Sequence, residues 1–162
     1  MTKRTYANGE IEVFWDSTRC VHVGWCSGSL PEVFDAQRKP WVILEGAKAD
    51  EVVQVVEACP SGALTYHRLD GGPQEQPESP ATIVPWPNGP LFVRGDFALR
   101  DNHGAPYETD CRAALCRCGQ SNNHPFCDLS HRKAGFESRP RAIPQDRHDA
   151  QSPHEVGPHF AD

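Results

Sequence analysis

The sequence has no long apolar run, no basic excess and few core-forming residues. No stretch approaches the roughly 18 consecutive apolar residues that a membrane helix needs, so we expect no membrane span. Lys and Arg total 16 against 22 Asp and Glu, and the net charge of −6 argues against a nucleic-acid-binding protein. Hydrophobic residues are 38% of the 162, which leaves little material for a large core.

Two further absences concern location and catalysis. Residues 1–5 include two basic side chains but no apolar stretch follows them, so we expect no signal peptide and a reducing, cytoplasmic location. The chain has neither a Gly-x-Gly-x-x-Gly loop nor a phosphate-cradling loop, and no Ser, His and Asp at the spacing of a catalytic triad. We therefore expect that the protein is not an enzyme.

The chain does contain seven cysteines, an odd number that no fully paired set of disulfides can use. In a reducing compartment, thiols in such numbers serve metal binding more often than cross-linking. Bound metal would also supply the cohesion that the low apolar content cannot. The cysteines form two groups, one within residues 20–59 and one within residues 111–127.

The two cysteine groups are separated by a segment rich in Gly and Pro. Residues 71–80 contain no aliphatic or aromatic side chain, which is typical of a linker. We interpret residues 1–70 as a first unit, 71–89 as a linker, 90–139 as a second unit and 140–162 as a flexible tail.

The hydrophobic pattern predicts short elements of both types, and hence an α+β fold. Apolar and polar side chains alternate in residues 11–15, which predicts a strand. Asp50 can cap a helix over residues 51–58, whose valines form an apolar face. Further strands are expected at 63–67, 91–93, 97–99 and 112–115.

The strongest motif comprises four soft or borderline metal ligands, Cys116, Cys118, Cys127 and His131. The spacing of four between Cys127 and His131 places both on one face of a helical turn. Cys116 and Cys118 point to the same side of an extended chain. Paired zinc ligands are usually separated by two to four residues, so the single residue between these cysteines suits an iron in a larger cluster better.

This segment resembles the CDGSH iron–sulfur domain, whose signature is Cys-x-Cys-x2-Ser/Thr-x3-Pro-x-Cys-Asp-Gly-Ser/Thr-His. One signature position differs, because Leu129 stands where the family has Gly. The resemblance covers residues 90–137 and implies a β-rich unit with a 2Fe–2S cluster. It places the Cys-x-Cys pair on one iron and Cys127 and His131 on the other. A zinc ion in an interaction module is the alternative. Cys111, outside the signature, is interpreted as a small apolar strand residue.

The first group comprises Cys20, Cys26 and Cys59. A cubane ferredoxin site has the spacing Cys-x2-Cys-x2-Cys followed by a distant Cys-Pro, and Val23 stands where the second of these cysteines would be. Residues 11–67 resemble the divergent mono-cluster 4Fe–4S ferredoxin-like domain, on the ending Cys-Pro-x-x-Ala-Leu and the Val-rich helix before it. The resemblance implies a small ferredoxin-like unit.

Related single-cluster ferredoxins without the second cysteine commonly hold a 3Fe–4S cluster, so the resemblance implies that cluster on the three thiolates. A 4Fe–4S cluster is the alternative, with water, His22, Asp16 or a group of a partner on the fourth iron. From residue type alone, the three cysteines could also be core residues without metal. Trp15, Trp25 and Trp41 are interpreted as core or cover residues.

Together the resemblances imply a two-cluster iron–sulfur protein that transfers single electrons to or from a redox partner protein, a reductase or an oxygenase. Residues 1–70 carry 7 basic and 10 acidic residues, which would suit a basic docking face. CDGSH domains are usually paired, so a single copy implies a homodimer unless the N-terminal unit covers the pairing surface. A cluster donor or a redox or pH sensor is the alternative, because protonation competes with iron for an imidazole.

Overall fold

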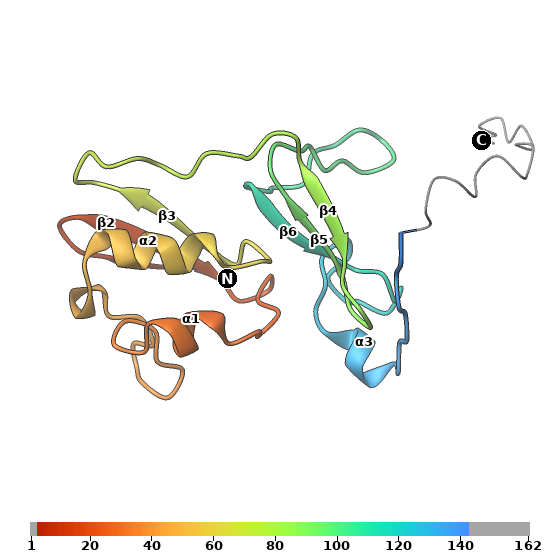
Figure 1. Cartoon of the computed structure of the whole chain (residues 1–162), viewed down its shortest axis with the longest axis horizontal. Coiled ribbons are helices and arrows are strands. Elements are labelled where there is room, and N and C mark those ends of the chain that lie inside the picture. Colours follow the sequence, from red (N-terminus) through yellow and green to blue (C-terminus); the bar gives the residue numbers. More distant parts are fainter. Residues whose placement is uncertain (1–2, 143–162) are drawn as a thin grey trace, which may run out of the picture.

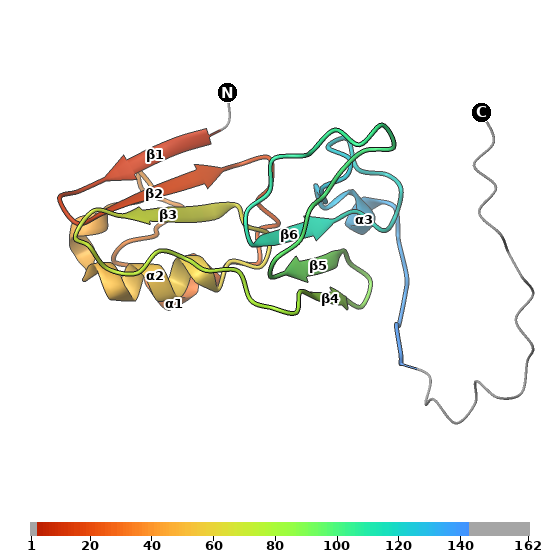
Figure 2. The ribbon, with the colours of Figure 1, turned by 90° about the horizontal axis from the view of Figure 1, so that it is seen from above.

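The computed structural model describes residues 3–142, whose helices and strands form two small units lying side by side (Figure 1 and Figure 2). Each unit has a three-stranded antiparallel sheet and short helices, which confirms the expected α+β class. Residues 143–162, which make up most of the tail predicted at 140–162, lie outside the described residues. No helix in the described part is long and apolar enough to cross a membrane.

The first unit is a sheet with a helix against one face. Its elements are β1 (Lys3–Ala7), β2 (Ile11–Asp16), α1 (Trp25–Ser29), the 3-10 helix η1 (Leu44–Gly46), α2 (Ala49–Glu57) and β3 (Leu64–Arg68). The central strand β2 pairs antiparallel with both β1 and β3. Ile11 and Val13 are completely buried while Glu12 between them is partly exposed, as the alternating sequence predicts for a strand with one buried face.

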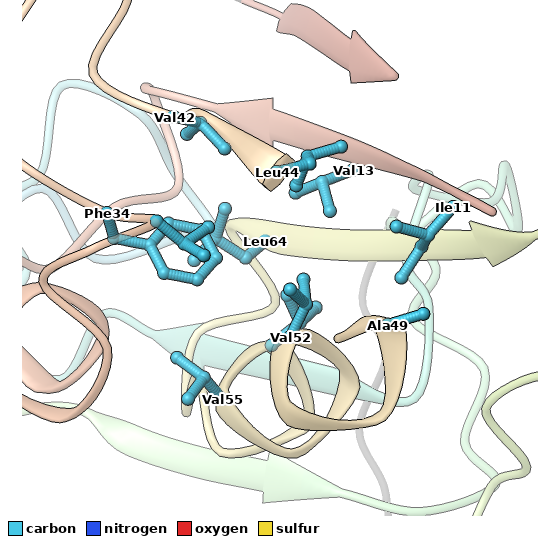
Figure 3. Close-up of a cluster of buried hydrophobic side chains, with 11 residues drawn as sticks. Ile11, Val13, Phe34, Val42, Leu44, Ala49, Val52, Val55 and Leu64 are labelled. Carbon is cyan, nitrogen blue, oxygen red and sulfur yellow. The ribbon is translucent and has the colours of Figure 1, made fainter. Parts of the chain in front are cut away.

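The main core lies between α2 and this sheet (Figure 3). Its buried members are Ile11, Val13, Val33, Phe34, Val42, Leu44, Ala49, Val52, Val55, Val56 and Leu64. Cys26 and Cys59 are partly buried against this core. The packing of the first unit therefore positions two of the predicted ligands.

Helix α2 begins two residues earlier than the sequence predicts. Lys48, not Asp50, is the N-cap, and its backbone N–H donates to the Glu51 carboxylate over 3.0 Å. Asp50 lies in the first turn, where its carboxylate forms an ion pair with Arg68 of β3. The prediction of Asp50 as the cap is wrong because the Glu51 side chain already satisfies the N-terminal N–H group.

The second unit has the strand order β4-β5-β6. Its elements are β4 (Thr82–Pro85), β5 (Leu91–Arg94), β6 (Arg112–Leu115) and α3 (Ser130–Lys133). Strand β4 lies within residues 71–89 and pairs with β5. The strand expected at 97–99 does not form, because β4 and β6 already occupy both sides of β5 and Gly95, at φ 117°, turns the chain out of the sheet.

A second, smaller core joins the two units. Its buried members are Val21, Ala114 and Cys127, and Phe92 and Leu129 pack against them. Val21 belongs to the first unit and directly follows a predicted ligand, whereas Cys127 is a predicted ligand of the second unit. The two predicted metal sites therefore adjoin the same small core.

Candidate metal centres

The C-terminal ligands lie on a loop that is fastened to β6. The backbone N–H of Cys116 donates to the carbonyl of Pro125 over 2.8 Å, and that of Cys127 donates to Ala114 over 2.9 Å. These bonds bring the two ends of the loop together. The sulfur of Cys116 lies 3.7 Å from that of Cys118.

The other two C-terminal ligands meet at the start of α3. His131 lies in the first turn of this helix, and its Nδ1 is 3.4 Å from the sulfur of Cys127. Leu129 is the N-cap with φ 71°, a left-handed conformation that explains why the signature has Gly there. The Leu129 side chain packs against the small core, so apolar contact offsets the backbone strain.

Each C-terminal pair has the spacing of two ligands on one tetrahedral metal. Two thiolates bound at about 2.3 Å to such a metal lie about 3.7 Å apart, and a thiolate and an imidazole nitrogen about 3.6 Å apart. Among residues 3–142, no three His, Cys, Asp or Glu side chains converge on a single ion. The two short distances define two pairs, Cys116 with Cys118 and Cys127 with His131.

Backbone N–H groups of the same loop surround the C-terminal sulfurs. Gln120 donates to Cys118 and Leu129 donates to Cys127, each over 3.4 Å from nitrogen to sulfur. Burial alone would raise the pKa of Cys116, but hydrogen bonds, the largest from the N–H of Ser121, bring this pKa below its ordinary value. The loop is thus arranged to stabilise thiolate charge.

In the other C-terminal pair, burial dominates and shifts the thiol pKa in the opposite direction. It raises the pKa of Cys127, and the neighbouring thiols of Cys116 and Cys118 add to the effect. Burial also lowers the pKa of His131, as does the charge of Arg132. The imidazole is therefore held in its neutral form, in which it can bind a metal.

The three N-terminal cysteines come from distant segments and meet at one cavity of about 680 Å³. Cys20 follows the turn after β2, Cys26 lies in α1, and Cys59 follows α2. Burial raises the pKa of Cys26, and the nearby thiols of Cys59 and Cys20 raise it further. The structure thus brings together the three residues that the sequence singles out.

Two buried indole N–H groups at the same cavity lack an acceptor. The Nε1 atoms of Trp15 and Trp41 are buried without a hydrogen-bond partner, and the two rings lie 4.9 Å apart. An unsatisfied buried donor costs about 1–3 kcal/mol. Burial raises the pKa of Cys20, but the Trp15 side chain acts in the opposite direction as a donor to this thiol. Sulfide or thiolate sulfur is therefore an acceptor suited to these indoles, and the cavity that they line fits an iron–sulfur cluster. The sequence indicates only that these aromatic residues are core or cover residues. It does not predict that their N–H groups lack an acceptor.

The structure separates the candidates for a fourth N-terminal ligand. His22 lines the cavity, and its Nδ1 is 3.7 Å from the sulfur of Cys20. Asp16 is not among the lining residues, and its carboxylate accepts hydrogen bonds from the backbone and hydroxyl of Thr18. Val23 lines the cavity but is 56% exposed.

Both sites border a second, open cleft of about 940 Å³ between the units. Val23 and Trp25 line it beside the N-terminal site, and His131 lines it beside the C-terminal site. Trp25 is 55% exposed here and is thus a cover residue rather than a core residue. Cys111 lines neither this cleft nor the N-terminal cavity, and its carbonyl accepts from the N–H of Gly95.

Comparison with known proteins matches each half of the chain separately. Residues 6–69 match the family model described as divergent 4Fe-4S mono-cluster, and residues 88–132 match the one described as iron-binding zinc finger, CDGSH type. Two relatives carry the name uncharacterized protein YjdI, from Escherichia coli K12 and O157:H7. Each is 36% identical over 63 residues, which are 39% of this chain and 83% of the relative.

Proposed function

Because this chain belongs to the iron–sulfur proteins that join a divergent 4Fe–4S mono-cluster domain to a CDGSH domain, we propose that it carries two clusters and transfers single electrons. The observation that carries this proposal is the small core that Val21 and Cys127 share with Ala114. Val21 is bonded to Cys20, so one side chain links the two ligand sets. A protein whose sites served unrelated roles would have no need of this proximity.

In this proposal the C-terminal site holds a 2Fe–2S cluster. Cys116 and Cys118 bind one iron, and Cys127 and His131 bind the other. The support is the spacing within each pair, 3.7 Å and 3.4 Å, which suits two tetrahedral metals. A single structural zinc ion would need all four donors around one centre.

The N-terminal site holds a 3Fe–4S cluster on Cys20, Cys26 and Cys59. Three thiolates match three irons, and the second cysteine of the ferredoxin pattern is replaced by Val23, whose side chain cannot bind metal. A 4Fe–4S cluster with His22 on its fourth iron is the second candidate, favoured by the position of this imidazole at the cavity.

Bound iron–sulfur clusters supply one-electron chemistry, and the protein sets where and how readily it occurs. The N–H groups of Gln120 and Leu129 and the indoles of Trp15 and Trp41 are donors that stabilise added negative charge. His131 and Trp25 at the open cleft give a redox partner, a reductase or an oxygenase, access to both sites. The protein acts in the cytoplasm as a carrier and not as an enzyme.

The test is reconstitution of the full chain under anaerobic conditions, followed by iron and sulfide analysis and low-temperature EPR before and after dithionite. We expect one signal before reduction, from the N-terminal 3Fe–4S cluster, and a second after reduction, from the 2Fe–2S cluster. A colourless protein with stoichiometric zinc would contradict the proposal. Transfer of the cluster to an apo-ferredoxin without electron exchange would favour the cluster-donor alternative.

A further inference from the structure

An arginine of the second unit reaches into the first unit and is almost completely buried there. Arg112 begins β6 and is 1% exposed. Its Nη1 donates to the carbonyls of Val56 and Cys59, each over 2.6 Å, and its Nη2 donates to that of Leu64 over 3.1 Å. These carbonyls belong to the end of α2, to a proposed cluster ligand and to the start of β3. One guanidinium thus fastens the chain on both sides of Cys59.

The charge of Arg112 is neutralised by Glu75. The carboxylate accepts from Nε over 2.8 Å and from Nη2 over 2.7 Å, and its side chain is only 13% exposed. Glu75 lies in the segment between the units that composition alone marks as a linker. Two-point pairing of this kind fixes the orientation of a guanidinium, which a lysine ammonium could not reproduce.

The backbone of Arg112 holds the same loop from another direction. A Cβ on Gly62, which has φ 63°, would lie 2.4 Å from the Arg112 carbonyl oxygen, so β6 touches the turn that follows Cys59. The same carbonyl accepts from Nη2 of the buried Arg19 over 2.7 Å. The Cys59 loop is therefore held between the side chain and the main chain of one residue of the second unit.

We propose that Arg112 and Glu75 form an interunit lock that positions the Cys59 loop, so that the N-terminal site is complete only when the second unit is folded against it. Three carbonyls and a carboxylate surround a guanidinium that has left water. Without it, the largely buried Glu75 carboxylate loses both of its donors, and the Val56 and Cys59 carbonyls keep only the N–H groups of Cys59 and Gly62. The inference rests on the proposed function in that Cys59 is taken as a cluster ligand. Arg112 is a positioning residue, since it acts on the site through the Cys59 backbone.

The experiment uses the full chain with Arg112→Gln, Glu75→Gln and Arg112→Lys. Arg117→Gln is the matched control, because Arg117 also donates to two backbone carbonyls, those of Gly89 and Trp86, but stays within the second unit. In metal-free protein, alkylation of each cysteine is followed by mass spectrometry. In reconstituted protein, the two EPR signals are quantified separately.

We expect Arg112→Gln to speed alkylation of Cys59 and to reduce the N-terminal EPR signal, each by about tenfold or more, with the C-terminal signal retained. Glu75→Gln should show the same pattern with a smaller effect, and Arg112→Lys should restore only part of the loss. Arg117→Gln should leave the alkylation of Cys59 at the wild-type rate.

Unchanged Cys59 alkylation and an unchanged N-terminal signal in Arg112→Gln would overturn the lock. So would an equal loss of both EPR signals in Arg112→Gln and Glu75→Gln, because general unfolding is then the explanation. If the wild-type chain binds no iron, the proposed function fails, whereas the alkylation pattern of the metal-free protein still decides whether the lock exists.

Discussion

The two metal sites are built in opposite ways. The C-terminal ligands lie within 16 residues of sequence, and backbone hydrogen bonds of their own loop hold them in place. The N-terminal ligands come from three segments, and the main core, α2 and a contact with the other unit bring them together. The first site is therefore a property of a local motif, and the second is a property of the whole fold.

The two sites also differ in thiol electrostatics, and the difference lies at Cys116. At the N-terminal site, burial raises the pKa values of Cys20 and Cys26 more than the nearby N–H groups lower them. At the C-terminal site, burial likewise raises the pKa of Cys127, but N–H groups of the loop bring the pKa of Cys116 below its ordinary value. A raised thiol pKa means that protons compete with metal up to a higher pH. Metal uptake at the N-terminal site should therefore keep improving at a pH where uptake at Cys116 has levelled off.

The sharpest test of separate sites is removal of one ligand at a time. Cys59→Ala should abolish the EPR signal of the N-terminal site and leave that of the C-terminal site, and Cys116→Ala should do the reverse. Cys111→Ala is the control, since Cys111 borders neither the cleft nor the N-terminal cavity, and both signals should persist. Loss of both signals in a single variant that remains folded would mean that the cysteines form one site.

Val23→Cys should change the cluster type of the N-terminal site alone. Val23 lines the cavity, and a thiol at this position completes the Cys-x2-Cys-x2-Cys spacing. The variant should gain iron and lose the EPR signal of the oxidised 3Fe–4S cluster. Val84→Cys is the control, because Val84 lines the open cleft but not this cavity. An unchanged signal in Val23→Cys would show that position 23 does not face the cluster.

His131→Cys should lower the reduction potential of the C-terminal site and leave the N-terminal potential unchanged. A neutral imidazole in place of a thiolate removes one negative charge, so the wild-type site accepts an electron more readily. Rieske centres, with two such replacements, lie roughly 250–700 mV above plant-type ferredoxins, so one replacement predicts a fall on the order of 100–300 mV in the variant.

The pH dependence of the same variant supplies its control. At low pH, protons compete with iron for the imidazole of His131, so the wild-type cluster should be lost in acid and the thiolate-ligated variant should resist longer. Potentiometric titrations and visible absorption between pH 5 and 9 would follow both effects. A potential that depends on pH equally in wild type and variant would exclude His131 as the proton-coupled ligand.

A matched pair of core substitutions tests how strongly each metal site depends on the packing of its own unit. Val52 is buried in the main core and Val93 is buried in β5. Val52→Ala and Val93→Ala should each lower the free energy of unfolding by about 1–3 kcal/mol. Denaturant titration of the metal-free chain checks this. Of the two, only Val52→Ala should weaken the N-terminal EPR signal, and the reverse result would contradict the comparison.

How much the sequence predicts also differs between the local C-terminal site and the N-terminal site, which the whole fold builds. The spacing of Cys116, Cys118, Cys127 and His131 is local, so the sequence alone indicates two pairs of ligands. The strands predicted at 11–15, 63–67, 91–93 and 112–115 are confirmed within a residue or two, whereas β1 and β4 were not predicted. The strand predicted at 97–99 is wrong because both neighbouring positions in the sheet are taken. Pairing in a sheet is decided by tertiary structure and not by local pattern.

Contacts that join the units left no signal in the sequence. Arg112 and Cys59 are 53 residues apart, and an arginine at the start of a strand is read as a surface residue unless its partners are known. The segment containing Glu75 has the composition of a linker, yet Glu75 is largely buried against that arginine. The indole N–H groups of Trp15 and Trp41 were missed for the same reason, because composition shows burial but not hydrogen-bond direction.

The smallest expected effect concerns Leu129, where the chain departs from the CDGSH signature. The left-handed backbone costs a residue with a Cβ about 1–2 kcal/mol, which glycine would recover. Glycine would also lower the free energy of unfolding by about 0.5–1 kcal/mol, because an unfolded chain with glycine has more conformational freedom. Partial burial of the leucine side chain contributes about 1 kcal/mol, since complete burial is worth about 1.5–3 kcal/mol.

These contributions nearly cancel, so Leu129→Gly should change the free energy of unfolding by less than about 1 kcal/mol. Leu129→Ala keeps the strained backbone and loses the packing, so it should be destabilised by about 1 kcal/mol. Denaturant titration of the metal-free variants distinguishes the two. If Leu129→Gly were the less stable variant, packing against the small core would outweigh the backbone strain, and the leucine would serve mainly to hold the two units together.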